Sequence, residues 1–281
     1  MMRPYRLGCP QWQHPNWNGR LPDGGSPLQR YGRVFDCVEG NTTFYATPTS
    51  SQCEQWRAQV HEHFRFQFKF PRAVTHDRLL VGADALVREF LDIMTPLQDV
   101  MGPFLLQLPA AFGPEHLNAL WAFLDDLPAP LSCAVEVRHL AFFAKGEGER
   151  MLNQGLRERN SARVCFDSRA LFSDTASDAV TADAQRKKPQ VPVHVLPVEA
   201  DPVIRFIGHP QLEANRAFLA PWVTRASEWI AAGHRPYMYI HMPDNGDALA
   251  LAELWHEMLG DVMPDLAPLP LVKQMDQPGL F

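Results

Sequence analysis

The chain has 281 residues, enough for one α/β domain of about 250 residues and too few for two. Its net charge is −6 and its basic residues are dispersed, so the composition argues against direct nucleic-acid binding. The five cysteines are widely spaced, which excludes a disulfide framework and indicates a reducing compartment. No segment approaches the roughly 18 apolar residues of a membrane span, and no leader precedes the first strand, so we expect a cytoplasmic protein.

Eight short apolar runs are expected to be strands, and seven of them finish on or just before a charged or amide residue. In chain order they span 6–9, 36–39, 66–69, 104–107, 133–136, 164–167, 203–205 and 237–241. Apolar residues at helical spacing lie between them, for example over 84–94, 115–124 and 216–230. Eight repeats of strand then helix predict a single (β/α)8 TIM barrel, whose active site forms at the C-terminal strand ends. The alternative is an open doubly wound sheet, but the glycine-rich nucleotide turns common in such sheets are absent from the sequence.

Two segments fall outside this repeat. Residues 173–201 predict a long excursion after the sixth strand, and the prolines at 189, 192 and 197 favour an extended path for it. Within it, the basic residues 186–188 have the character of a solvated loop. The chain becomes proline-rich after Pro264, so we expect a barrel domain over 1–263 and an extended, mobile tail over 264–281.

Side chains alternate between the two faces of a strand, which assigns each strand residue to the barrel interior or to the helix layer. Three phenylalanines share one face of the third strand, so Gln67 and Lys69 are expected to face inward. The same counting directs a set of polar residues to the mouth: Glu39, Asn41, Glu136, Arg138, Asp167, Arg205 and His241. The bland alternative is that some of these are structural ion pairs filling the interior.

Neighbouring positions supply further candidates for substrate contacts. Gln107 ends the fourth strand, His76 follows the third, and Asn245 follows the last. Trp12 and Tyr45 are expected to form part of an aromatic wall around a ligand, although aromatic loops also serve as lids over a core.

Six blocks of sequence resemble the YecE-like family, also called domain of unknown function 72. They are G-C-P-Q-W from Gly8, V-E-G-N-T-T-F-Y from Val38, F-K-F-P from Phe68, L-L-Q-L-P from Leu105, V-E-V-R-H from Val135 and R-F-I-G from Arg205. The resemblance covers nearly the whole chain and implies a TIM barrel related in shape to sugar isomerases and metal-dependent endonucleases. It implies no reaction. Family members often carry an aliphatic residue in place of Gly40, and a histidine where this chain has Ile207, with His209 two residues later.

Our first functional hypothesis is an enzyme acting on a small polar anion such as a sugar phosphate. Lys69, Arg138 and Arg205 would hold the anion, because guanidinium groups suit phosphate and carboxylate. Glu39 or Glu136 would be the general base. His76 or His241 would be the acid.

Two other enzymatic interpretations use the same residues. A divalent metal (Mg²⁺, Mn²⁺ or Zn²⁺) would take its ligands from Glu39, Glu136, Asp167 and His241, although the neighbouring cations would compete for the carboxylates. Lys69 could instead form a Schiff base with a substrate, although nearby carboxylates would favour its charged form.

A fourth hypothesis comes from the C-terminus and concerns a partner rather than a reaction. The pattern Q-x-x-L-F, formed by Gln277, Leu280 and Phe281, looks like the peptide with which bacterial replication and repair proteins dock on the DNA sliding clamp. Gln277 would bind at the rim of the clamp pocket, and the two apolar side chains would fill it. The chain would then be a non-catalytic accessory of DNA metabolism. The bland alternative is a terminus that folds back onto the barrel.

Overall fold

The computed structural model describes residues 2–176, 178–195 and 200–273. Its strands form parallel ladders in three sheets, of order β1-β9-β8-β7, β2-β3 and β4-β5-β6. The strands are β1 (Arg6–Gly8), β2 (Cys37–Gly40), β3 (Arg65–Phe68), β4 (Phe104–Gln107), β5 (Cys133–Glu136), β6 (Ala162–Arg163), β7 (Cys165–Asp167), β8 (Val203–Ile207) and β9 (Tyr237–His241). The chain therefore has an α/β fold built on parallel sheets.

Backbone contacts also link one sheet to the next. The Asp36 and Glu39 N–H groups donate to the carbonyls of Leu7 and Cys9 at 3.2 and 3.0 Å, which joins β2 to β1. Parallel bridges from Phe66 to Met101 and from Lys69 to Leu105 join β3 to β4. Strands β6 and β7 are separated only by Val164, whose N–H donates to the carbonyl of Val135 at 2.9 Å. They therefore continue one another, as the single sixth strand expected from the sequence.

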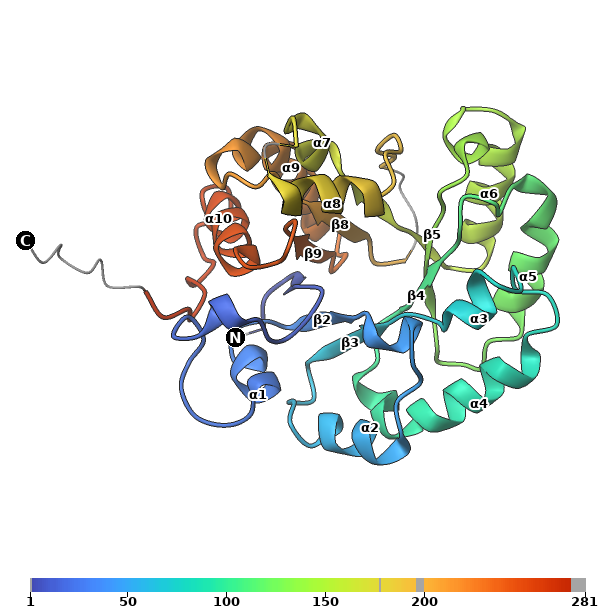
Figure 1. The fold of residues 1–281 in the computed structure, drawn as a ribbon, viewed down its shortest axis with the longest axis horizontal. Helices are drawn as coiled ribbons and strands as arrows, with labels where there is room; N and C mark the ends of the chain where they lie inside the picture. The colour runs from blue at the N-terminus through green and yellow to red at the C-terminus, as the bar shows by residue number, and fades with distance from the viewer. Residues whose placement is uncertain (1, 177, 196–199, 274–281) are drawn as a thin grey trace, which may run out of the picture.

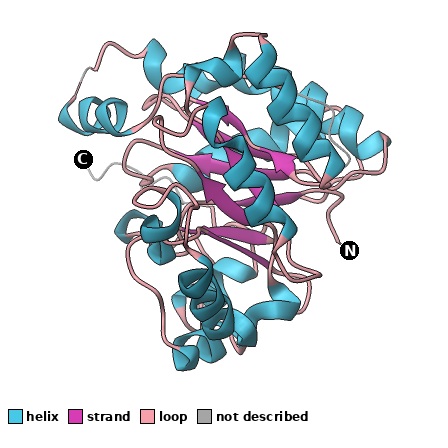
Figure 2. Ribbon diagram, turned by 90° about the vertical axis from the view of Figure 1, so that its right-hand side faces the viewer, coloured by secondary structure: helices cyan, strands magenta, loops and turns pink. Residues whose placement is uncertain are grey.

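Helices surround the strands, which lie in the middle of the molecule (Figures 1 and 2). They are α1 (Pro27–Gly32), α2 (Ser50–Arg57), α3 (Arg72–Thr75), α4 (Asp84–Met94), α5 (Leu117–Asp125), α6 (Glu147–Glu158), α7 (Arg169–Ser173), α8 (Ala179–Lys187), α9 (Arg216–Ala231) and α10 (Ala248–Gly260). Three of these, α4, α5 and α9, lie within two residues of the ranges expected from helical spacing.

Both faces of the strands are buried, as is usual for parallel sheets. A large cluster packs the helices onto one face, with residues such as Phe68, Phe70, Trp222 and Trp255. A second, smaller cluster, here called the inner cluster, lies on the other face of the strands. It comprises Cys37, Leu105, Ala134, Ala162, Val164, Phe166, Leu171, Ala184, Val191, Val203, Ile207, Tyr237 and Tyr239. The polar residues of the candidate site continue this inner face toward the carboxyl ends of the strands.

The excursion between β7 and β8 is more regular than the sequence predicted. Residues 179–187 form helix α8, begun by Asp178, whose carboxylate accepts a hydrogen bond from the Thr181 N–H at 2.7 Å. The described residues 188–195 that follow it have no regular secondary structure, and Lys188 at their start has extended backbone angles. Ser168 donates to the carbonyl of Pro189 at 3.0 Å, and His194 lies 2.5 Å from buried Glu149 of α6. The excursion is thus tied to the body at two points.

The first part of the proline-rich tail packs on the body, contrary to the expectation of a mobile tail. Residues 266–273 have no regular structure, but Leu269 and Leu271 are buried. The carbonyl of Ala267 accepts a hydrogen bond from His256 Nε2 at 2.9 Å, and the Val272 N–H donates to the carbonyl of Arg20 at 2.9 Å. The clamp pattern at Gln277, Leu280 and Phe281 lies outside the described residues.

Within the ranges described, no helix combines the length and the apolar character needed to cross a membrane.

The approach of β1 to β2 gives a test of the fold. A Cβ atom added to Gly8 would lie 2.2 Å from the carbonyl oxygen of Cys37, which is backbone and cannot move aside alone. We expect Gly8→Ala to lower the free energy of unfolding by about 2–3 kcal/mol, because overpacking strains the strand pair.

Gly260→Ala is the matched control, since nothing lies within 4 Å of its added Cβ at the end of α10. It should leave the stability unchanged or raise it by up to about 1 kcal/mol. Equal urea midpoints for the two variants would contradict this packing.

Candidate functional site

Arg205 of β8 lies between two carboxylates that come from β2 and β5. Its Nε donates to Glu39 Oε2 at 2.6 Å and its Nη2 donates to Glu39 Oε1 at 2.8 Å, a bidentate pair. Its Nη1 donates to Glu136 Oε2. All three side chains are buried, where an unpaired charge would cost several kcal/mol. The three charges therefore depend on one another for their place in the interior.

Two more side chains complete the contacts of these carboxylates. Arg138 donates from Nε and Nη2 to Glu136 Oε1 at 2.9 and 2.7 Å, and its side chain is about one-fifth exposed. His241 Nε2 lies 3.3 Å from Glu39 Oε2. Every carboxylate oxygen of Glu39 and Glu136 thus has a partner.

These partners determine the charge of both carboxylates. Burial alone would raise the pKa of Glu39, but Arg205 and His241 hold that pKa well below its usual value. At Glu136 burial also raises the pKa, but Arg205 and Arg138 lower it further, to about 2. Groups that bind protons so weakly are poor bases near neutral pH. The lowered pKa values of Glu39 and Glu136 argue against either residue as the general base.

Lys69 lies next to these residues and is hydrogen-bonded to a neutral group. Together with Glu39, Glu136, Arg138, Arg205 and His241 it forms what is here called the charged cluster. Its Nζ donates to Gln107 Oε1 at 2.9 Å, and Glu39 Oε1 is 3.8 Å away. The Phe44 ring centroid lies 5.6 Å from the amine. Burial, together with the Arg205 guanidinium, lowers the pKa of Lys69 to about 7 in spite of the nearby carboxylates. The amine is therefore close to half neutral at neutral pH.

Lys188 brings a fourth cation to the cluster, and the sequence analysis missed it. Burial and the Arg205 guanidinium lower the pKa of Lys188 to about 8, while Glu39 and Glu136 oppose them. Lys188 was grouped with Arg186 and Lys187 as part of a solvated loop. Those two are exposed and pair with Asp183 on the surface of α8, but Lys188 is half-buried.

A signal for Lys188 was present in the sequence. A residue that precedes proline is forced out of the helical conformation. Pro189 therefore ends α8 at Lys187, and Lys188 has extended backbone angles, with φ −98° and ψ 140°. Lys188 therefore does not lie on the exposed face of α8 with Arg186 and Lys187. The hydrogen bond from Ser168 to the carbonyl of Pro189 holds it near the end of β7.

The structure places Asp167 on the opposite face of its strand from the one expected. Its Oδ2 accepts hydrogen bonds from Arg169 Nη2 at 2.8 Å and from Trp222 Nε1 at 2.7 Å, in the helix layer. Phe166 faces the inner cluster instead, with the Arg205 guanidinium 5.5 Å from its ring centroid. A buried carboxylate can face the helices here because Trp222 and Arg169 supply its donors.

Both histidines of the first hypothesis are neutral near pH 7. Burial lowers the pKa of His241 to about 4, against the influence of Glu39. Burial and Arg138 lower the pKa of His76 to about 4. His76 bonds Thr75 Oγ1 at 2.9 Å and contacts the Phe44 ring edge to face. Neither imidazole carries the proton that a general acid would donate at neutral pH.

Four other expected contact residues have structural partners. Asn41 Nδ2 donates to the carbonyl of Pro10 at 3.0 Å, and Asn245 Oδ1 accepts from the Met242 N–H at 3.1 Å. Trp12 packs against Trp56 and Phe66, in the helix-facing core. Tyr45 is 83% exposed and contacts the Phe44 ring. In the described part of the chain, no hydrogen bond, ion pair or ring contact joins these four residues directly to Lys69, Arg205, Glu39 or Glu136. Tyr45 approaches them only through Phe44, whose ring lies 5.6 Å from the Lys69 amine.

The four residues expected as metal ligands are not gathered around one point. Asp167 faces α9, and Arg205 takes up oxygens of both Glu39 and Glu136. Among residues 2–176, 178–195 and 200–273, no group of three or more His, Cys, Asp or Glu side chains could hold a metal ion.

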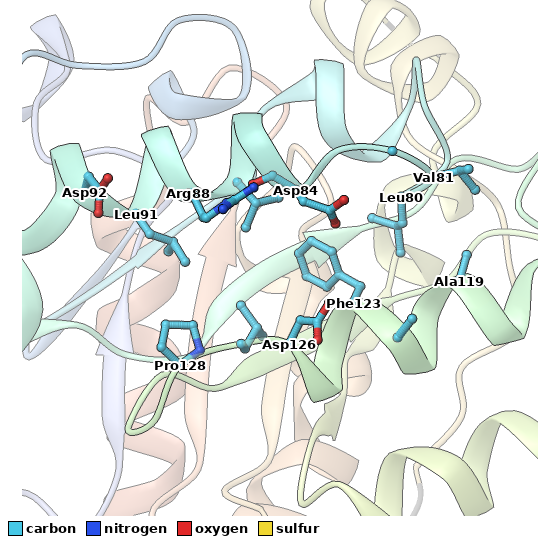
Figure 3. A pocket seen from close by; sticks show the side chains of 14 residues that line it. Leu80, Val81, Asp84, Arg88, Leu91, Asp92, Ala119, Phe123, Asp126 and Pro128 are labelled. Atoms are coloured by element: carbon cyan, nitrogen blue, oxygen red, sulfur yellow. The ribbon is translucent and has the colours of Figure 1, made fainter.

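A separate cavity lies in the helix layer, between α4 and α5 (Figure 3). Its volume is about 660 Å³, and Leu91 and Phe123 are among the apolar side chains that line it. Asp84 and Asp126 also line it, from the α4 and α5 sides. It contains none of the residues of the charged cluster.

The sequence profile described as "Protein of unknown function DUF72" matches residues 6–274. The chain belongs to the DUF72 family. A curated DUF72 relative, UPF0759 protein YecE of Escherichia coli K12, is 44% identical over 275 residues, covering 98% of this chain and 99% of the relative. The protein of the same name from Escherichia coli O157:H7 matches to the same extent.

Solved structures of DUF72 proteins have the same fold. A family member from Enterococcus faecalis V583 superimposes with a TM-score of 0.69 at 18% identity, covering 97% of this chain and 100% of that one. One from Thermotoga maritima MSB8 gives a TM-score of 0.63 at 21% identity, covering 91% and 98%. These similarities concern the fold, and the family description states no activity.

The paired charges around Arg205 give a stability test. Arg205→Met keeps the side-chain volume but leaves Glu39 and Glu136 without their shared cation. We expect the free energy of unfolding at pH 7 to fall by about 3–5 kcal/mol. The loss should shrink as the pH falls toward 4, because the abandoned carboxyls can then bind protons.

Arg186→Met is the matched control, because Arg186 is exposed and pairs only on the surface of α8. Its effect should stay within about 0.5 kcal/mol. A variant at Arg205 as stable as the wild type would show that the triad does not hold these strands together.

Proposed function

We propose that the chain is an enzyme acting on a small anionic substrate at the carboxyl ends of the strands of a closed (β/α)8 barrel. Closure is supported by the neighbours of each strand, because β1 bonds both β9 and β2, and β3 both β2 and β4. With β6 and β7 as one strand, each strand then has two neighbours, as a closed sheet requires. Active sites of such barrels lie at the carboxyl ends of the strands.

The observation that carries the proposal is the charge balance of the cluster. Lys69, Arg138, Lys188 and Arg205 supply four positive charges when both lysines are protonated, whereas Glu39 and Glu136 supply two negative ones. Four less two leaves two positive charges beside a buried region, where unpaired charge is costly. An anion carrying one or two negative charges, such as a carboxylate or phosphate, would balance them.

The arrangement also distinguishes the cations by role. Arg205 is engaged by the two carboxylates, so it positions them instead of holding the anion as first expected. Lys188 forms no hydrogen bond or ion pair with any described side chain, and Arg138 is partly exposed, so these two would bind the anion. Lys69 would react with the bound substrate, because a pKa near 7 leaves its amine able to exchange a proton or to act in its neutral form at neutral pH.

Sulfate tests the anion site, because its own charge is constant between pH 6 and 9. Calorimetry should detect sulfate binding to the intact chain at pH 6, and Lys188→Gln should weaken it by about tenfold or more, the value of one charged hydrogen bond. Raising the pH to 9 should weaken binding to the wild type, because Lys69 and Lys188 lose their protons near pH 7 and 8.

Lys187→Gln is the matched control, as the neighbouring lysine that pairs with Asp183 on the surface. It should bind sulfate as the wild type does. Affinity that is indifferent to Lys188 and to pH would refute an anion site at this cluster.

A further inference from the structure

Lys69 and Lys188 are the two cations of the cluster that lack a carboxylate partner at hydrogen-bonding distance among the described residues, and of these two Lys69 is fixed by a strand bridge to Leu105. The two oxygens of Glu39 accept from Nη2 and Nε of Arg205, at 2.8 and 2.6 Å. Glu136 is bonded by Arg205 on one oxygen and by Arg138 on the other. The carboxylates are thus already neutralised by guanidinium groups. Lys69 is left with the amide oxygen of Gln107, a neutral acceptor.

The remaining surroundings of Lys69 favour an uncharged, well-positioned amine. Its side chain is only 10% exposed, so water stabilises the ammonium poorly. Its backbone is fixed on both sides, because its N–H donates to the carbonyl of Gly40 and its carbonyl accepts from Thr43 Oγ1 at 2.7 Å. Burial and Arg205 lower its pKa to about 7, so a large share of the molecules carry the neutral amine near neutral pH. A neutral amine is the form that attacks a carbonyl carbon.

We infer that Lys69 forms an imine with its substrate, and that the substrate is a small aldehyde or ketone carrying a carboxylate or phosphate group. This inference rests on the proposed function, since the anionic group would be held by Lys188 and Arg138. It names the substrate class that the charge balance alone leaves open.

The step balances without an oxidant, a reductant or a further reactant. The Nζ lone pair of Lys69 forms a bond to the carbonyl carbon, and the π electrons of the C=O bond move to its oxygen. Proton transfer from nitrogen to oxygen gives a carbinolamine. The C–O bond then breaks and the oxygen leaves as water with both amine protons, so that one amine and one carbonyl yield one imine and one water.

Reductive trapping tests the inference directly. The full chain is incubated at pH 7 with pyruvate, glyoxylate or dihydroxyacetone phosphate, each with sodium cyanoborohydride, and its peptides are mapped by mass spectrometry. Reduction fixes the imine as a secondary amine, so the peptide gains the mass of the probe less one oxygen atom. The sequence has few lysines to distinguish, at positions 69, 145, 187, 188 and 273.

With at least one probe, we expect Lys69 to be modified at least about tenfold faster than Lys187, because an ordinary lysine is almost wholly protonated at pH 7. Sulfate should slow the reaction by competing for the anion site. Lys69→Arg should abolish the modification of the site, whereas Lys187→Arg should leave the Lys69 adduct unchanged.

Absence of an adduct on Lys69 with all three probes, or equal modification of Lys69 and Lys187, would overturn the inference. So would an adduct that forms faster on Lys188 than on Lys69. Measuring sulfate binding to the same preparation distinguishes failure of the imine from failure of the proposed function. If no imine forms but sulfate binds, only the imine is refuted. If sulfate does not bind either, the proposed function is refuted as well.

Discussion

The rest of the site depends on the hydrogen bonds of Arg205, which donates two to Glu39 and one to Glu136. It connects β8 to β2 and β5, strands that form no ladder with one another, through side chains that are almost wholly buried. Buried charges of this kind are tolerated only when each has its partners. Arg205 donates hydrogen bonds to both carboxylates. Neither carboxylate therefore lies within hydrogen-bonding distance of Lys69. The lowered pKa of Lys69 follows from its burial, together with the Arg205 guanidinium beside it.

Strand alternation predicted a large part of this site from the sequence. Lys69, Glu39, Glu136, Arg205 and His241 do face one another, since parity along a parallel strand is set by backbone geometry alone. The positions of the strands, and the family to which the chain belongs, were also predicted correctly. These features depend on local pattern and spacing, which a single sequence contains.

The failures share a different physical origin. Asp167 was assigned to the inner face by counting alternate residues along its strand, and the sequence could not show that Trp222 and Arg169 supply hydrogen-bond donors to it on the other face. Lys188 was missed because Pro189 was not used to end the preceding helix, and because a single sequence does not show that the residues after α8 return to the end of β7. The sequence also could not show the partners of the carboxylates. Glu39 and Glu136 were expected to act as bases and to favour the charged form of Lys69, whereas in the structure Arg205 and Arg138 donate hydrogen bonds to them.

The residues of this site come partly from the strands and partly from a loop, as is common in α/β proteins. The strands fix Lys69 and the carboxylates. The excursion supplies Lys188 and is itself held by Ser168 and by the contact of His194 with Glu149. Under the proposed function, the anion-binding charge of Lys188 and the amine of Lys69 would come from separate parts of the chain. Substitutions in the excursion would then change which anion is bound without disturbing the buried pairs.

The most direct test of this account is the ionisation of Lys69 itself. Protein labelled with ¹⁵N at the lysine side chains would be titrated by NMR between pH 5 and 11, with the Lys69→Arg variant identifying the signal. The account predicts a midpoint at about 7, displaced from the ordinary lysine value of 10.5. A midpoint close to 10.5 would show that the carboxylates keep the ammonium charged, and would contradict the central claim that Arg205 leaves Lys69 without a carboxylate at hydrogen-bonding distance.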